Sequence, residues 1–263
     1  TNSTTYSSGP TELHIGRDNF VGGRYYLDGY LDDIRIIKGT ALYTESFTVP
    51  TSALGATGNA ISLVGGFKDL ARNNAVTKEG DTTTSPSVKK FGTSSAYFDG
   101  TTDRLVVDHS GSLNLRNTDF TIEGWFYLAD TSEPIRLVYS TGGTGTRSGW
   151  LIYATSGAFQ FWASSVTNAW DIASGQSLGS RTNSAWVHLA VTREGNTFRC
   201  FQNGTQTSTF VSSKSLYTDP NEQIAIGGWA SGGDVQYLNG YIDDLRIIKG
   251  HAKYTANFTA PTS

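Results

Sequence analysis

The sequence predicts an all-β protein built as a two-sheet antiparallel sandwich. Thirty glycines and abundant Ser and Thr accompany 12% aromatic residues, which is typical of many short strands joined by tight turns. Segments of alternating hydrophobicity recur at a spacing of roughly 8–12 residues with turn signals between them, and this spacing favours a sandwich or a barrel. Helices should therefore be few and short.

The end of the chain repeats an earlier segment. Residues 237–263, YLNGYIDDLRIIKGHAKYTANFTAPTS, match residues 26–52 at 19 of 27 positions. The two copies lie 211 residues apart, a period too long for a solenoid unit and typical of tandem whole domains. We therefore expect residues 1–52 to be the C-terminal part of a preceding copy, residues 53–263 to be a complete domain, and residues 52–60 to be a short linker.

Strands are expected at residues 13–15, 25–37 and 61–66, followed by a polar stretch of turns. Residues 94–100 and 104–110 predict a hairpin with Asp99-Gly100 in its connection. Residues 119–128 alternate strictly, as expected of a sandwich strand with one face toward the core. The side chains on one face are Phe120, Ile122, Phe126 and Leu128, and those on the other are Thr121, Glu123, Trp125 and Tyr127.

Later segments also predict hairpins. Residues 149–165 predict two strands about the Ser156-Gly157 turn, and residues 186–210 predict three strands that break at residues 194–196 and at Asn203-Gly204. Residues 223–229 then lead into the strand of the repeated segment. Cys200 is the only cysteine, so the chain has no intrachain disulfide and no thiolate metal site, and Cys200 is expected to be buried.

Charge and hydropathy exclude two classes of partner. Charged residues make up only 16% of the chain and the net charge is −3, so there is no basic face for nucleic acid and no polybasic membrane patch. No segment approaches the roughly 18 consecutive apolar residues of a membrane span. We expect neither nucleic-acid binding nor membrane insertion.

Five motifs occur in order: YFDGTTDRLVV, LNLRNTDFTIEGWFYL, WVHLAVTREGNTFRCFQNG, IAIGG and LNGYIDDLRIIKG. With these motifs residues 55–263 resemble the laminin G-like, concanavalin A-like lectin superfamily, and residues 11–52 resemble the last strands of the same module. The ending is similar to tandem repeats of bacteriophage virion proteins and bacterial surface proteins. The resemblance implies a jelly roll, a location outside the cell or on a virion surface, and neighbouring copies or subunits of the same appendage as partners.

The catalytic pattern of the related glucanases is missing. Those enzymes present paired carboxylates from one strand in an E-x-D-x-x-E pattern, whereas Glu123 stands alone on its strand and the four histidines are scattered. We predict no enzyme, but a non-enzymatic tandem repeat of a larger extracellular or virion appendage, such as a phage fibre or capsid protein, that serves assembly and adhesion to cell-surface glycans. The alternative is a carbohydrate-binding module of a bacterial adhesin or of a secreted glycan-active enzyme.

The pair Asp243-Asp244, repeated as Asp32-Asp33, is a candidate metal site. In a regular strand Asp243 would share the side of Leu245 and Ile247, where a carboxylate needs partners. One interpretation is a Ca²⁺ site formed by Asp99, Asp103 and Asp243, because related modules hold calcium with oxygen ligands on edge loops. The other is a carboxylate that accepts backbone N–H groups or pairs with Arg104 or Arg246.

Three tryptophans are the candidates for sugar binding. Trp162, Trp170 and Trp229 lie in or beside segments rich in Gly, Ser and Asn, from which an indole could stack on a pyranose ring. Equally, each could simply cover the end of a sheet. Trp125, Trp150 and Trp186 lie within strands and are expected to pack. In the first copy Asp18 stands at the position of Trp229, so the two copies differ there.

Overall fold

The computed structural model describes residues 17–18, 25–26, 46, 76–108, 114–129, 134–141, 147–219, 222–231 and 234–262. The chain forms two compact units, Thr1–Val64 and Gly65–Ser263. The described residues contain no helix, and so none long and apolar enough to cross a membrane. The strands expected at residues 13–15 and 61–66, the part of the strand expected at 25–37 that follows Tyr26, and the linker at 52–60 lie outside the described residues.

A short strand pair in the first unit matches one in the second. β1 (Arg17–Asp18) is antiparallel to β2 (Tyr25–Tyr26), with Arg17 opposite Tyr26. β16 (Gly228–Ser231) is antiparallel to β17 (Asp234–Tyr237), with Gly228 opposite Tyr237. Adding 211 to each residue of the first pair gives its counterpart in the second. The sequence repeat is therefore accompanied by an identical strand register.

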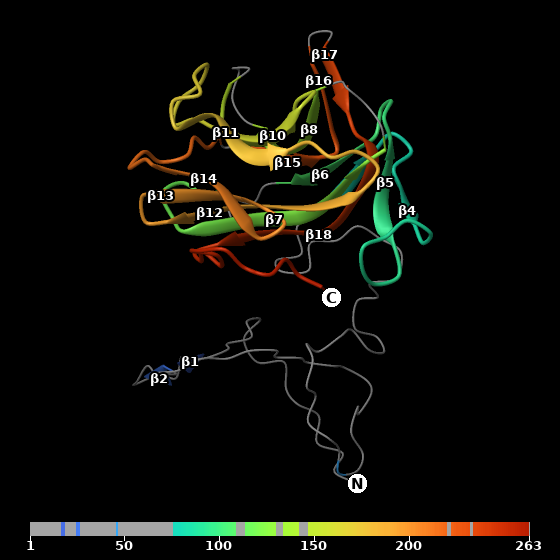
Figure 1. Ribbon diagram of the computed structural model, residues 1–263. Helices are drawn as coiled ribbons and strands as arrows, with labels where there is room; N and C mark the ends of the chain where they lie inside the picture. The colour runs from blue at the N-terminus through green and yellow to red at the C-terminus, as the bar shows by residue number, and fades with distance from the viewer. Residues whose placement is uncertain are drawn as a thin grey trace. The chain divides into compact units, whose positions relative to one another are not determined.

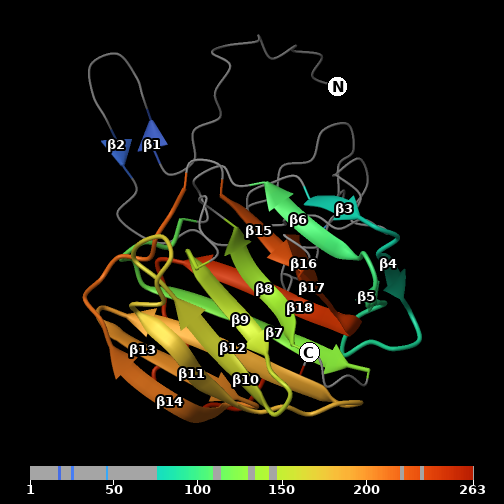
Figure 2. The same cartoon turned by 90° about the horizontal axis from the view of Figure 1, so that it is seen from above.

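The second unit is a sandwich of two seven-stranded antiparallel sheets, which lie one above the other in Figure 1 and one in front of the other in Figure 2. The order in the upper sheet is β11 (Ala173–Ser180), β10 (Ala158–Ala163), β9 (Trp150–Ala154), β8 (Ile135–Thr141), β15 (Gln223–Ile226), β6 (Arg104–Asp108) and β3 (Val76–Glu79). The order in the lower sheet is β14 (Thr205–Val211), β13 (Thr197–Gln202), β12 (Trp186–Glu194), β7 (Phe120–Leu128), β18 (Asn239–Lys249), β5 (Ser95–Asp99) and β4 (Thr83–Ser85). The predicted all-β jelly-roll sandwich is confirmed.

The core lies between the sheets, where the predicted alternation places it. Phe120, Ile122, Phe126 and Leu128 of β7 are fully buried in one cluster with residues of the upper sheet such as Ile152. Each such side chain contributes about 1.5–3 kcal/mol of transfer free energy. The predicted β9–β10 and β12–β13–β14 hairpins are confirmed, and Cys200 is fully buried.

The hairpin predicted for residues 94–100 and 104–110 is wrong. β5 pairs with β4 and β18 in the lower sheet, whereas β6 pairs with β3 and β15 in the upper sheet. The connection after Asp99 therefore crosses from one sheet to the other. Phe98 and Leu105 both face the common core from opposite sides, so the alternation alone was compatible with either arrangement.

The regular strand assumed for Asp243 is also wrong. β18 carries an irregularity between Asp243 and Arg246, and Asp244 has a φ of 47°. Asp243 is paired with Trp125, and directly opposed side chains share a face of the sheet, so Asp243 lies on the outer side of the lower sheet. Leu245 and Ile247 instead pack against the core.

The C-terminal tail, residues 250–262, covers the outer face of the lower sheet (Figure 1). Tyr254 and Phe258 pack with Ala190 and Phe201 of that sheet, and the Tyr254 and Phe258 rings stack at a centroid distance of 3.4 Å. The Phe258 N–H donates to Gly204 O at 2.9 Å. A Cβ at Gly204 would collide with the Phe258 carbonyl, so this turn needs glycine both for its φ of 81° and for the approach of the tail.

Glu123 is the buried anchor of the tail. Its side chain is 1% exposed and accepts hydrogen bonds from Tyr254 Oη at 2.7 Å and Lys253 Nζ at 3.1 Å. His188 Nε2 of β12 lies 3.2 Å from Glu123 Oε2, and Arg246 of β18 lies 3.1 Å from Oε1. Burial raises the pKa of Glu123, but the bonds from His188, Tyr254 and Lys253 and the charge of Arg246 outweigh it and lower that pKa to about 2.

The lowered pKa of Glu123 predicts acid sensitivity. A carboxyl whose folded pKa lies below its ordinary value of 4.5 stabilises the fold fully above that value, and the contribution is lost as pH falls toward about 2. The shift corresponds to about 3 kcal/mol. In pH-dependent urea unfolding, Glu123→Gln should lose about 3–5 kcal/mol at pH 7 and show a flatter pH dependence below pH 4.5.

The matched control is Glu194→Gln, which removes an exposed carboxylate 3.1 Å from Arg199. Its stability should change by less than about 1 kcal/mol. An unchanged acid profile in Glu123→Gln would show that Glu123 does not anchor the tail.

Candidate functional site

The outer face of the upper sheet carries two rows of side chains set by the strand register. In one row Trp162 of β10 lies opposite Leu151 of β9, which lies opposite Tyr139 of β8. In the next row Gln160 lies opposite Tyr153, which lies opposite Arg136. Paired residues share a face, and neighbouring strands are about 4.8 Å apart. We call this surface, completed by Trp170 and Trp229, the aromatic face.

All three candidate tryptophans lie on this face. Trp162, Trp170 and Trp229 are half-buried and pack against one small cluster formed by Tyr139, Leu151 and Ala225. Each indole is therefore supported by the sheet and remains partly exposed. The structure thus brings together residues that are 67 positions apart, from Trp162 to Trp229.

A hollow of about 470 Å³ lies at one end of the aromatic face. It is lined by Arg147, Trp162, Asn168, Ala169, Trp170 and Ser174. The rings of Trp162 and Trp170 are 5.8 Å apart at an interplanar angle of 59°, and Trp162 Nε1 donates to Gln160 Oε1 at 3.2 Å. The two indoles thus form an angled wall, and Arg147 and Asn168 add polar groups to the rim.

Asp171 holds the loop that carries Trp170. Its carboxylate accepts hydrogen bonds from the Ser165 backbone N–H and hydroxyl, both at 2.7 Å, and from Lys214 Nζ at 2.8 Å. Burial raises the pKa of Asp171, but these bonds outweigh it and lower that pKa to about 2. The Asp171 carboxylate therefore connects the two ends of the β10–β11 loop and also binds Lys214.

Trp229 occupies the other part of the face. It lies on the β16–β17 hairpin, which projects above the upper sheet in Figure 1. The Arg136 guanidinium carbon lies 3.9 Å from the Trp229 ring centroid, and Arg136 Nε donates to Gln236 Oε1 at 3.1 Å. Gln236 Nε2 in turn donates to Tyr153 Oη at 3.5 Å. This polar network fixes the orientation of Trp229.

The other three tryptophans are structural, as predicted. Trp150 is 1% exposed within the core. Trp125 and Trp186 lie on the outer side of the lower sheet, where Trp125 contacts Phe91 and Lys90 and Trp186 contacts Tyr127.

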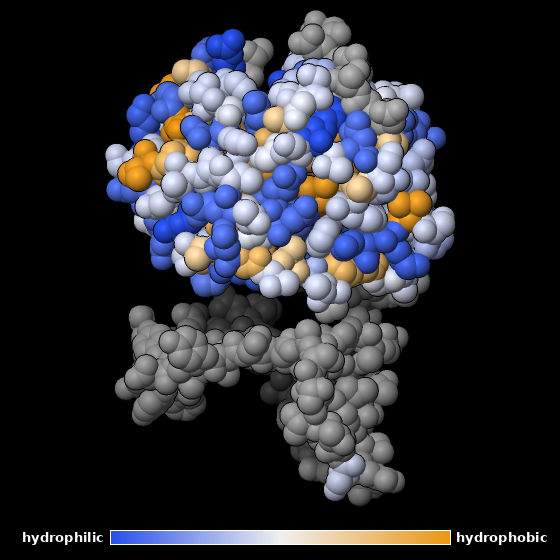
Figure 3. Space-filling view, viewed as in Figure 1, coloured by the Kyte–Doolittle hydropathy of each residue, from blue (hydrophilic) through white to orange (hydrophobic). Residues whose placement is uncertain are grey.

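On the side of the sandwich that Figure 3 shows, the coloured surface is mostly hydrophilic or intermediate, with small separate hydrophobic patches. That side offers no broad apolar interface.

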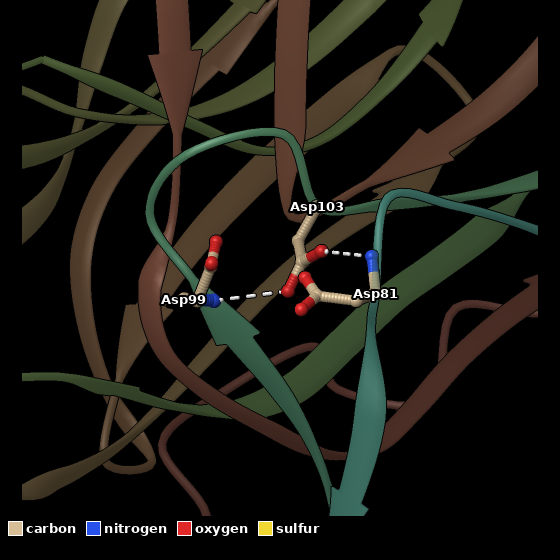
Figure 4. Close-up of side chains that lie close together, drawn as sticks. All are labelled: Asp81, Asp99 and Asp103. Carbon is tan, nitrogen blue, oxygen red and sulfur yellow. Dashed lines mark hydrogen bonds between the residues drawn. The ribbon is translucent and has the colours of Figure 1, made fainter.

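Among the described residues, one group of three acidic side chains could reach a common cation (Figure 4). The carboxylate oxygens of Asp81, Asp99 and Asp103 lie within 4.8 Å of one another. Asp103 is 1% exposed, and its two oxygens accept the N–H groups of Asp81 at 2.8 Å and of Asp99 at 3.0 Å. Burial raises the pKa of Asp103, and bonds from Thr101 lower that of Asp99.

These three carboxylates are an incomplete ligand set for Ca²⁺. The ion takes six to eight oxygens, so backbone groups or water would have to supply the rest. The hydrogen bonds of Asp103 themselves join the β3–β4 turn to the β5–β6 connection, and they need no metal ion.

Asp243 is not part of this group. Its Oδ2 accepts the N–H groups of Lys90 at 2.8 Å and Phe91 at 3.0 Å, and its Oδ1 accepts the N–H of Asp244 at 2.9 Å. The structure thus brings Asp99 and Asp103 together, adds Asp81, and leaves Asp243 to the segment around Lys90.

The fold and motifs agree with a comparison of protein families. The family described as the concanavalin A-like lectin/glucanases superfamily matches residues 99–252. This chain belongs to that superfamily. The matched residues of the concanavalin A-like domain begin at Asp99 and include all three candidate tryptophans. A search of curated proteins found no match.

Solved structures share this concanavalin A-like fold. One is domain 4 of AbnA, a GH43 extracellular arabinanase from Geobacillus stearothermophilus in complex with arabinotriose, with a TM-score of 0.52 and 16% identity over 69% of this chain and 84% of that chain. Another is the binding domain of botulinum neurotoxin serotype D, with a TM-score of 0.50 and 12% identity over 69% of this chain. The match spans 44% of the neurotoxin structure. At these identities the likeness shows the fold alone.

The bonding of Asp103 predicts a stability effect that needs no metal. Asp103→Asn turns one oxygen into an amide that faces a backbone donor, so the variant should lose about 1–3 kcal/mol in urea unfolding with a chelator present. The exposed Asp81→Asn is the control and should change stability by less than about 0.5 kcal/mol in chelator.

Thermal melts of the same proteins in chelator and in millimolar calcium test whether a cation binds. A bound ion must raise the melting temperature of the wild-type protein, and Asp81→Asn must remove that gain. If Asp103→Asn is as stable as the wild type in chelator, its proposed tie is wrong.

Proposed function

We propose that this chain is a non-catalytic, carbohydrate-binding repeat of a larger extracellular or virion appendage. The observation that carries the proposal is the convergence of Trp162, Trp170 and Trp229 on the aromatic face, beside a hollow with a polar rim. A supported indole with one open side can stack on the apolar face of a sugar ring, while amide and guanidinium groups take its hydroxyls.

The arabinanase domain supports this assignment by analogy. It has a similar fold and is described in complex with arabinotriose, so a sandwich of this kind can hold an oligosaccharide. If this module were joined to a glycan-active enzyme or an adhesin, the same binding face would serve there. That arrangement is the alternative context for the proposal.

The described carboxylates near the aromatic face do not favour hydrolysis. A general acid needs a raised pKa, whereas the pKa of Asp171 is lowered to about 2. Glu79 lies 2.6 Å from Arg104. Burial raises the pKa of Glu222 to about 7, although Ser140 and the Asp219 backbone oppose the shift. Glu222 is only 3% exposed and lies beside Ser140. Ser140 is paired with the core residue Ile224, so its side chain faces the core and not a sugar on the outer face.

Sugar binding predicts a position-specific effect of tryptophan substitution. The 263-residue protein should bind arabinotriose or another neutral oligosaccharide with a dissociation constant near millimolar, measured by NMR titration. Trp170→Ala and Trp229→Ala should each weaken binding by about three- to tenfold, because each removes one stacking surface.

The matched control is Trp186→Ala, which removes a half-buried indole from the lower sheet and should leave binding unchanged. Absence of binding to a broad glycan panel at 10 mM would refute the proposed function. An equal loss in Trp186→Ala would refute the assignment to the aromatic face.

We also propose that residues 1–52 are the end of a preceding copy. The 19 identities in 27 positions and the shared register of β1–β2 and β16–β17 support this division. In the second unit the equivalent residues are held by β7 and β5, which flank β18. Residues 26–52 would need the same neighbours from a preceding copy or from an adjoining subunit.

Hydrogen exchange tests this division with an internal control. In the 263-residue monomer the amides of Ile36 and Ile37 should exchange rapidly, while those of Ile247 and Ile248 in β18 should be strongly protected. Addition of an upstream copy to the chain should protect both pairs. Strong protection of Ile36 and Ile37 in a demonstrated monomer of 263 residues would show instead that the two units fold together.

A further inference from the structure

We infer that the hollow beside Trp162 and Trp170 selects an acidic sugar, with Arg147 as the residue that recognises its carboxylate or sulfate group. The inference rests on the proposed function and specifies the class of glycan. It begins from an asymmetry of charge, because the chain as a whole has a net charge of −3 whereas the aromatic face carries arginines.

Each tryptophan site on the face is accompanied by an arginine. Arg136 lies against Trp229 with its guanidinium carbon 3.9 Å from the ring centroid, and its Nε is bonded to Gln236. Arg147 lines the hollow with Trp162 and Trp170. An arginine paired with a stacking ring can hold a planar carboxylate while the ring holds the sugar to which it is attached.

The charges around the hollow leave Arg147 unneutralised. Asp171 follows Trp170 directly, but its carboxylate is engaged by Lys214 Nζ at 2.8 Å and by Ser165. Among the described residues Arg147 has no ion pair, and it is exposed. Its guanidinium therefore presents free donors to a ligand, and the hollow has a net positive charge.

The contacts also distinguish Arg147 from two arginines of the upper sheet, Arg104 of β6 and Arg136 of β8. Arg104 lies 2.6 Å from Glu79, so its charge is compensated. Arg136 serves to orient Trp229 and Gln236. Arg147 has neither role, which makes it the position where a substitution can change charge recognition without removing a support of the fold.

The test compares an acidic oligosaccharide with its methyl ester, in which a methyl group on each carboxyl removes the charge. Trigalacturonate and its fully methyl-esterified form are titrated by calorimetry or NMR in 50 mM and 300 mM salt, together with a sulfated disaccharide to distinguish sulfate from carboxylate. The wild-type protein should bind one of the anionic ligands at least about tenfold more tightly than the neutral ester, and the preference should shrink in high salt.

Substitution of Arg147 should remove this preference alone. Arg147→Gln should bind the acid and the ester equally, with the ester affinity unchanged, and Arg147→Lys should retain part of the preference. Arg199→Gln on the lower sheet is the control, and it should preserve the full preference.

The outcomes separate this inference from the proposed function. If the ester binds as tightly as both anionic ligands, the inference is wrong while carbohydrate binding stands. If an acid is preferred but Arg147→Gln keeps the preference, Arg147 is not the recognition residue. If none of these three ligands binds, the inference is wrong, and the broad glycan panel decides separately whether the proposed function stands.

Discussion

The buried carboxylate of Glu123 is the interaction on which the arrangement of the two faces depends. A charge with 1% exposure is tolerable only when it is fully paired, and its partners come from β12, β18 and the tail. The pairing joins three strands of the lower sheet and fixes the tail across them. Other bonds also hold the tail, such as those from Thr192 Oγ1 to Tyr254 O and from the Phe258 N–H to Gly204 O, but Glu123 is the buried charge that these tail residues help to pair.

The tail and the Lys90 segment cover the lower sheet around Glu123, whereas the aromatic face lies on the opposite side of the sandwich. Thr121, Glu123 and Trp125 alternate with core residues on β7, yet all are buried because the tail and the Lys90 segment lie over them. On the upper sheet the outward residues of β8, β9 and β10 instead support half-buried tryptophans. The two outer sides of the sandwich therefore differ: the tail packs on one, and the other carries partly exposed tryptophans.

The sequence predicts much of this, and its failures have physical causes. Period-two alternation identified the core face of β7, and Asn203-Gly204 identified a hairpin, because both signals are local. Alternation shows which side of a strand is buried but not which sheet it joins, so β5 and β6 were wrongly paired. Alternation also could not show the irregularity between Asp243 and Arg246, which places Asp243 on the opposite side of the strand from Leu245 and Ile247. The turn-rich segments around Trp162, Trp170 and Trp229 made these residues predictable. Arg136 and Arg147 carry no sequence signal, since surface arginines are common. The register of β8 brings Arg136 to the aromatic face, and the folded chain before β9 brings Arg147 to the hollow.

The two copies of the repeated segment agree at the residues that hold the tail and differ at the position of Trp229. At the positions of Arg246, Tyr254 and Phe258 the first copy has Arg35, Tyr43 and Phe47, so the residues that dock the tail are retained. At the position of Trp229 it has Asp18, and Leu42 replaces Lys253. An aspartate cannot stack on a sugar, and its negative charge would repel an anionic glycan. Under the proposed function, the two copies would share the residues that hold the tail and would differ at the position where Trp229 meets a ligand.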